Sequence, residues 1–274
     1  MTYDIHTHAY HPKIAHKVIA QLEDHYGIPP VGTGRIEDLL AKAEAGGIDR
    51  VVVHSAATSP AQVIPANNWA IGLERDHPRV RAFGTLHPDY PDNEAELSRL
   101  EAAGIVGIKL HADFQGFRLD DRRLWPIFEM LSGRFTVMLH VGDVLPPEKN
   151  NSCPKKVAAI HRDFPELTII AAHMGGYQHW KWALEHLIGR DVYIDTSSTL
   201  EFIDDATLEA IYRRHPRERI LFGSDYPLFD PGVERIRLRE RLGLTDADME
   251  MALTTAGELF PLTGSGDTGS PDIS

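Results

Sequence analysis

Short apolar runs recur along the chain, and the stretches between them show apolar residues at helical spacing. Eight such runs can be counted, each rich in valine, isoleucine or leucine and without strict alternation with polar residues. This pattern is typical of parallel strands that are buried on both faces of a sheet. The runs occupy Thr2–His8, Arg50–Ser55, Val80–Pro88, Gly104–Ala112, Phe135–Asp143, Leu167–Gly175, Val192–Ser197 and Ile220–Pro227.

The segments between the runs favour helices. Residues 35–48 carry apolar side chains along one side of a helix, and Gly46 and Gly47 follow where that helix would end. Residues 94–105 and 206–216 show the same pattern, each with glycine or proline shortly before the next strand-like run. The apolar side in the first of these segments consists of Ile36, Leu39, Leu40 and Ala43.

Alternating strands and helices with short connections imply a parallel sheet with right-handed crossovers. Eight such units predict a closed (β/α)₈ TIM barrel, a single α/β domain over residues 1–262. An open doubly wound sheet is the structural rival, but no glycine-rich phosphate-binding turn follows the first strand. Residues 263–274 have little to bury and are expected to form a disordered tail.

Amino-acid composition limits the classes of partner that the protein is expected to bind. The net charge of −12 argues against nucleic acid or an anionic membrane as the main partner, because both require basic patches. The single Cys153 cannot form an intrachain disulfide, which fits the cytoplasm. The chain starts directly in a strand-like run and has no apolar stretch of membrane-spanning length, so neither a signal peptide nor a membrane segment is expected.

Polar residues stand at the ends of otherwise apolar strands. TIM barrels build their active sites at the C-terminal ends of the strands, so these residues are expected to meet at one rim. Burying so many polar groups without partners would cost several kcal/mol each, a cost that a bound metal ion with its water would remove. In chain order they are His6 and His8, His54, His87, Lys109 and His111, His140, His173, Asp195, and Asp225.

His6 and His8 are alternate residues of one strand and therefore face the same side. Two such imidazoles, together with His140 and Asp225, form a ligand set that suits a zinc-class divalent ion. Taken singly, each motif has a plainer explanation. A lone HxH pair can arise by chance, a single histidine can be a satisfied core residue, and an aspartate can cap a turn. The coincidence of all of them favours a metal site.

The ordered motifs resemble a known family. DIHTH, GIKLH, MLHVGD, PELTIIAAHMGG, VYIDTS and RILFGSDYP are similar to the amidohydrolase-2 branch of the amidohydrolase superfamily, and the similarity covers nearly the whole chain. That branch comprises metal-dependent TIM barrels and includes lactonases, hydratases and decarboxylases related to aminocarboxymuconate-semialdehyde decarboxylase. The resemblance implies that the ligands of the metal are His6, His8, His140 and Asp225, with His173 as the strand-six histidine.

Lys109 leaves two versions of the metal centre open. In binuclear members of the superfamily a strand-four lysine becomes carboxylated and bridges two ions. In the mononuclear branch one ion is typical and the strand-six histidine acts on the substrate. The surrounding motifs favour one divalent ion, with zinc the best match and manganese, iron, cobalt and nickel as alternatives. A second metal on carboxylated Lys109 is not excluded. As a free cation Lys109 could instead pair with a neighbouring carboxylate or hold a substrate carboxylate.

These observations predict a metal-dependent hydrolase of a small carboxylate-bearing lactone, ester or amide, acting through a metal-activated water. Asp225 would accept the proton and His173 would stabilise the developing oxyanion, whereas Lys109 and His111 would bind substrate. The alternative is a metal-dependent decarboxylase, a carboxy-lyase, of an aromatic or muconate-like acid. A barrel that binds a metal or ligand without turnover is a less favoured explanation. We expect the protein's partner to be a small-molecule substrate, and a homo-oligomer is compatible with the sequence.

Two loops add weaker candidates. Residues 143–154 form a long segment after the fifth strand, and long loops often serve as lids or binding loops. Asp143 and Cys153 in that loop, and Gln115 and Arg118 after the fourth strand, are therefore possible substrate contacts. A role in packing or at the surface explains each of them equally well.

Overall fold

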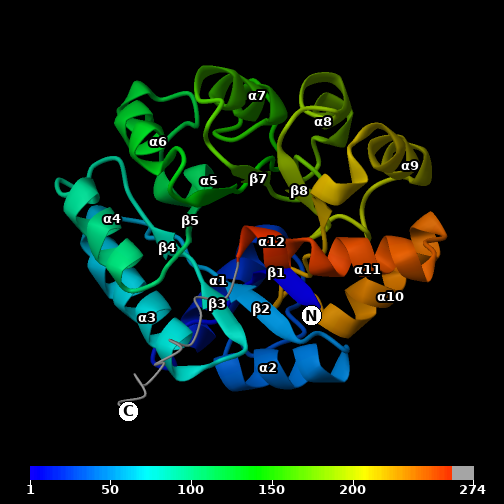
Figure 1. Cartoon of the computed structure of the whole chain (residues 1–274), viewed down its shortest axis with the longest axis horizontal. Helices are drawn as coiled ribbons and strands as arrows, with labels where there is room; N and C mark the ends of the chain where they lie inside the picture. Colours follow the sequence, from blue (N-terminus) through cyan, green and yellow to red (C-terminus); the bar gives the residue numbers. More distant parts are fainter. Residues whose placement is uncertain (261–274) are drawn as a thin grey trace, which may run out of the picture.

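The computed structural model describes residues 1–260, which form a ring of helices around a barrel of parallel strands (Figure 1). The strands are β1 (Tyr3–Thr7), β2 (Arg50–Val53), β3 (Val80–Ala82), β4 (Gly84–Thr85), β5 (Gly107–Leu110), β6 (Thr136–Leu139), β7 (Ile169–Ala171), β8 (Tyr193–Asp195) and β9 (Ile220–Leu221). The longer helices are α1 (Ala15–Tyr26), α2 (Ile36–Ala45), α3 (Val63–Asp76), α4 (Asn93–Ala102), α6 (Trp125–Leu131), α7 (Pro154–Asp163), α8 (Trp180–His186), α9 (Asp205–Arg214), α10 (Pro231–Leu242) and α11 (Asp246–Thr254).

Backbone hydrogen bonds close the barrel at two places where the strand ladders are interrupted. One ladder runs β1-β2-β3 and the other runs β4-β5-β6-β7-β8-β9, all parallel. Phe83 lies between β3 and β4, and its N–H donates to the carbonyl of Val53 at 2.9 Å. On the other side the N–H of Ile5 donates to the carbonyl of Phe222 at 3.0 Å. The predicted TIM barrel is thus confirmed, with the third strand split into β3 and β4.

The barrel interior is apolar toward the N-terminal ends of its strands. Short helix α12 (Ala256–Leu259) lies across this end, in the middle of the ring in Figure 1. The interior cluster contains side chains of β1, β2, β6, β7 and β9, of α12 and of adjoining residues, and includes Tyr3, Ile5, Val52, Phe83, Met138, Ile170, Leu221, Ala256 and Phe260. Gly107 leaves room for the Phe83 ring, because a Cβ at that position would come within 2.3 Å of it. A second, larger core fills the layer between strands and helices.

Helix α1 is a feature that the sequence analysis did not identify. It follows the first strand and carries apolar side chains four residues apart, which are Ile14, Val18, Leu22 and Tyr26. Gly27, with φ of 67°, ends the helix in the left-handed conformation that glycine adopts without strain. Helix α2 ends at Gly46, as the sequence predicts.

The expected disordered tail, residues 263–274, lies outside the described residues. Across residues 1–260 the structure contains no helix that is both long enough and apolar enough to cross a membrane.

We expect His215 to make the stability of the fold depend on pH. Its Nε2–H donates to the carbonyl of Val192 at 3.0 Å, and its Nδ1 accepts from the N–H of Gly189 at 3.1 Å. Burial lowers the pKa of His215 to about 4, so the folded chain resists protonation that the unfolded chain accepts below about pH 6.5. Stability should therefore fall as pH drops from about 6.5 to 4, by about 3 kcal/mol from this residue.

Denaturant unfolding at several pH values tests this expectation. His215→Gln should be less stable than the wild type at pH 7 and should show a flatter loss of stability toward pH 4. His16→Gln, at an exposed position on α1, serves as the control and should follow the wild-type curve. Parallel curves for His215→Gln and the wild type would show that His215 does not set this pH dependence.

Candidate metal centre and active site

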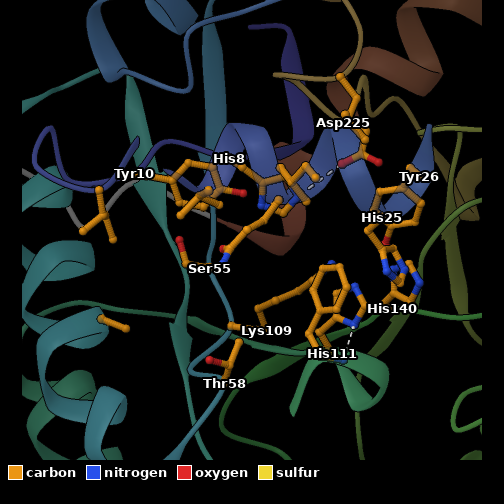
Figure 2. A pocket seen from close by; sticks show the side chains of 18 of the residues that line it. His8, Tyr10, His25, Tyr26, Ser55, Thr58, Lys109, His111, His140 and Asp225 are labelled. Atoms are coloured by element: carbon orange, nitrogen blue, oxygen red, sulfur yellow. Dashed lines mark hydrogen bonds and ion pairs between the residues drawn. The ribbon is translucent and has the colours of Figure 1, made fainter. Parts of the chain in front are cut away.

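A cavity of about 1030 Å³ opens at the C-terminal ends of the strands. Helix α1, the first half of α3 and short helix α5 (Ala112–Gln115) supply much of its wall. Figure 2 shows His8, Lys109, His111, His140 and Asp225 pointing into this space. The structure thus brings every proposed catalytic, metal-binding and substrate-binding residue to one cavity, which is lined by His6, His8, Lys109, His111, His140, His173 and Asp225.

The His6 ring is held from behind by two oxygens. Its Nδ1 lies 2.9 Å from Oδ2 of Asp195 and 2.9 Å from Oγ of Ser197. Because the Ser197 hydroxyl itself donates to Asp195, the proton of this contact belongs to His6 Nδ1. The Nε2 atom of His6 therefore carries a lone pair instead of a proton. Nζ of Lys109, 3.3 Å away, points at it as a donor.

His8 is oriented in the same manner and faces Asp225. Its Nδ1–H donates to the backbone carbonyl of His54 at 2.8 Å, which leaves Nε2 without a proton. That atom lies 3.1 Å from Oδ1 of Asp225, and Oδ1 is also 3.6 Å from Nε2 of His6. Three electron-rich atoms therefore converge on one point, an arrangement that a cation stabilises.

His140 and His173 form a second convergence. Nε2 of His140 donates to the carbonyl of Gly142 at 3.0 Å, and Nδ1 of His173 donates to the carbonyl of Ser197 at 3.1 Å. The two remaining nitrogens face each other at 3.0 Å, as lone pair to lone pair in the neutral rings. Such a contact requires a shared proton or an ion between the rings.

Burial favours the neutral, metal-binding form of these histidines. It lowers the pKa of His6 to about 4 and holds that of His140 well below the usual range. Burial also lowers the pKa of Lys109, to about 8. For Asp225, burial alone would raise the pKa, but His6 and His8 hold it well below the usual range, so the carboxylate is ionised.

The backbone around the cluster adopts conformations that need support. Asp225 has φ of 65° and His173 has φ of 63°, in the left-handed region where residues other than glycine are strained. The N–H of Asp225 donates to the carbonyl of His6 at 2.8 Å, and the Ser198 hydroxyl donates to its carboxylate. Next to it, a Cβ on Gly223 would lie 2.8 Å from Cβ of His6. The sequence Gly-Ser-Asp thus fits a strand end packed closely against His6.

The four predicted ligands do not all touch one another in the structure. His6, His8 and Asp225 meet directly, whereas His140 pairs with His173 and stacks on His111, with ring centroids 3.8 Å apart. Groups whose ligand atoms all lie within 4.8 Å of one another are His6, His8 and His54; His6, His173 and Asp195; and His111, Asp113 and His140.

Several site residues escaped the sequence analysis. Ser197 and Ser198 directly follow β8, and their hydroxyls contact His6, His173 and Asp225. The VYIDTS motif contained a signal for them, because hydroxyl side chains continue past the strand end. The cavity also has an aromatic wall, made by Tyr10, Tyr26, Trp69, Phe114 and Tyr177. These aromatic residues lie on loops and helices, and the pattern of strand ends does not predict them.

The loop candidates have structural roles, and within the described chain none of them lines the cavity. Asp143 lies 3.6 Å from Nε2 of His25, and Cys153 is buried at the start of α7. Arg118 pairs with Asp120. Gln115 joins three strand ends, because its amide donates to the carbonyls of Ala57 and Leu86 and accepts from the N–H of His111.

Replacing Gln115 should therefore destabilise the rim. Gln115→Leu leaves one buried N–H and two carbonyls unpaired, at a cost of about 1–3 kcal/mol for each group. We expect a loss of at least about 3 kcal/mol in the free energy of unfolding, measured with denaturant. The control is Gln21→Leu, an exposed amide on α1, which should change stability little. A variant at position 115 as stable as the wild type would show that the three hydrogen bonds are replaceable.

The chain matches a protein-family model and several solved structures. A family model described as amidohydrolase matches residues 3–262. No curated protein matches the chain.

Solved structures similar to the chain share its fold at low sequence identity. A 2,6-dihydroxybenzoate decarboxylase complexed with 2,6-dihydroxybenzoate has 18% identity and a TM-score of 0.71, covering 95% of this chain and 99% of its own. A candidate 2-pyrone-4,6-dicarboxylic acid hydrolase from Pseudomonas putida has 19% identity and a TM-score of 0.66, with coverages of 94% and 97%. A dihydroxybenzoic acid decarboxylase from Polaromonas sp. JS666, with bound manganese and 2-nitroresorcinol, has 16% identity and a TM-score of 0.69, with coverages of 96% and 98%.

Proposed function

This chain belongs to the amidohydrolase family, and we propose that it is a metal-dependent hydrolase of a small carboxylate-bearing lactone, ester or amide. The observation that carries the proposal is the common arrangement of four histidines that line the cavity. Each of His6, His8, His140 and His173 is tied through one nitrogen to an oxygen acceptor and presents the other, unprotonated, toward its neighbours. Metal-binding histidines are characteristically oriented in this way.

The donor set fits a divalent ion. Nitrogens and oxygens that share one ion, each about 2.0–2.2 Å from it, lie roughly 3.0–3.5 Å apart. The contacts of Asp225 Oδ1 with His8 and His6, 3.1 and 3.6 Å, are close to this spacing. We assign the ion to His6, His8, His140 and Asp225, which requires the His140 ring to turn from His173 toward the other three. Zinc suits three imidazoles and a carboxylate best, and manganese, bound in the Polaromonas decarboxylase, is an alternative.

When bound, the ion supplies Lewis-acid activation of a water molecule or of a substrate oxygen. The protein's own groups supply proton transfer and binding. Asp225 is ionised and faces the cavity, so its carboxylate can accept a proton and return it to the leaving group. His173 presents a lone pair in its neutral form, so it can donate to an oxyanion only after Nε2 has taken up a proton.

Lys109 and His111 are suited to hold the substrate. Nζ of Lys109 is buried beside His6, and no arginine is among the residues that line the cavity in the described chain. Lys109 is therefore the deepest fixed cation available to a substrate carboxylate. His111 is stacked between Phe114 and His140, which fixes the plane of its ring at the cavity wall. Carboxylation of Lys109 to bridge a second ion is the alternative use of this side chain.

The second candidate function is decarboxylation of an aromatic or muconate-like acid. The aromatic wall favours it, because Tyr26 and Phe114, with ring centroids 6.1 Å apart, offer an apolar surface for a flat ring inside the cavity. The related decarboxylases act on dihydroxybenzoates by name. Both reactions use the same acid–base groups, so their products distinguish them. We propose a cytoplasmic enzyme for either function.

We predict about one equivalent of divalent metal per chain, measured by elemental analysis of protein purified without chelator. The double variant His6→Ala/His8→Ala should lose the ion, because two of its four ligands are gone. His16→Ala is the control with a surface histidine removed. Two equivalents would instead support carboxylated Lys109 as a bridge. Absence of metal in the wild type, even after zinc or manganese is added, would contradict the proposal.

We predict that Asp225→Asn retains the ion but loses turnover by about 10²–10⁴-fold, because an amide can still coordinate but cannot accept a proton. Lactones, esters, amides and carboxylated aromatics would be screened in ¹⁸O-labelled water. Hydrolysis incorporates the label into the product and releases no carbon dioxide. Carbon dioxide release by the wild type would favour the decarboxylase, and full activity of Asp225→Asn would remove the assigned role of Asp225.

A further inference from the structure

His54 is a buried histidine that the proposed function leaves without a role. It directly follows β2, and only 1% of its surface is exposed. Neither of its ring nitrogens has a hydrogen-bond partner among residues 1–260. His6, His8, His140 and His173 each have an acceptor for one ring N–H, and His54 differs from them in this respect. An unpaired buried polar group costs about 1–3 kcal/mol, which calls for a partner that the described protein atoms do not provide.

His54 is packed against the two histidines that we assign to the ion. Its ring centroid lies 4.7 Å from that of His6 and 4.7 Å from that of His8, both in edge-on geometry. One nitrogen of each of the three rings lies within 4.8 Å of the others. Ligand atoms that share one ion lie closer together than this limit, so a small movement of these side chains would bring the His54 nitrogen into the same coordination sphere.

The side from which His54 approaches also fits a ligand. His54 is absent from the lining of the substrate cavity in the described chain, whereas His6, His8 and Asp225 are part of it. A donor on the covered side would leave the cavity-facing positions of the ion open to water and substrate, as a catalytic site requires. The rival explanation is a buried water. A cavity of about 10 Å³ beside His54, Asn67 and Thr85 is at the lower limit for holding one.

We propose that His54 is a further ligand of the metal ion, contributed by the end of β2 alongside His6, His8 and Asp225. This inference rests on the proposed metal dependence of the enzyme. It adds a strand-two donor to a ligand set that the sequence assigned to strands one, five and eight.

The test uses the full-length protein loaded with one equivalent of Co²⁺. Proton NMR of this protein shows strongly shifted, solvent-exchangeable N–H signals from each histidine bound to the ion. The affinity for Co²⁺ is measured by competition with a chromophoric chelator. His54→Phe fills the space without a donor, and His54→Asn is a second variant in case the larger ring prevents folding. His87→Phe is the matched control, because His87 also follows a strand and is also buried. Among the described residues, His87 belongs to none of the groups of closely spaced potential metal ligands.

We expect His54→Phe to lose one shifted N–H signal and to bind Co²⁺ at least about 100-fold more weakly, whereas His87→Phe keeps both properties. His54→Asn should lose the same signal. A full set of signals and unchanged affinity in either folded His54 variant would overturn the inference and leave His54 with a buried water. If neither variant folds, the wild type decides, with four shifted signals expected from His6, His8, His54 and His140. Three signals would overturn the inference. A wild type that binds no Co²⁺ would instead refute the proposed function itself.

Discussion

The site depends on hydrogen bonds that fix which nitrogen of each histidine carries its proton. Asp195 does this for His6, and backbone carbonyls do it for His8, His140 and His173. The acceptors for His6, His8 and His173 belong to other strand ends, whereas Gly142 follows His140 by two residues. The directions of the lone pairs of His6, His8 and His173 are therefore set by the relative positions of strand ends, and a rigid barrel keeps the site rigid.

The N-terminal end of the barrel stabilises the fold, whereas the C-terminal end holds the polar groups of the candidate active site. Toward the N-terminal ends the interior is filled by apolar side chains and covered by α12. Toward the C-terminal ends the same interior holds a lysine, neutral histidines and ionised aspartates, all deeply buried. A polar cluster of this kind is unfavourable by itself, because burial without full pairing penalises each group. The apolar end and the helical ring provide the stability that tolerates it.

The barrel and the membership of the cluster could be predicted from sequence, because polar residues interrupt the apolar runs near or just after the ends of the strands. The orienting groups could not be predicted in the same way. The carbonyls of His54 and Gly142 act through backbone atoms, which leave no residue-type signal. The pairing of His140 with His173 depends on rotamers and on the positive φ of His173, which only the folded chain determines. Helix α1 does show an apolar spacing in the sequence, but it lies outside the strand ends from which the site was predicted.

The contact between His8 and Asp225 joins residues 217 positions apart in the chain. During synthesis on the ribosome, β1 emerges first, and its histidines wait until β9 and the following turn have left the exit tunnel. A nascent chain that ends before Asp225 therefore has histidines but no complete binding centre. Loading of the proposed ion would therefore follow translation of nearly the whole barrel, and the ion would reach a finished scaffold instead of nucleating one. Early metal scavenging by a partly made chain is thus limited to weak, partial ligand sets.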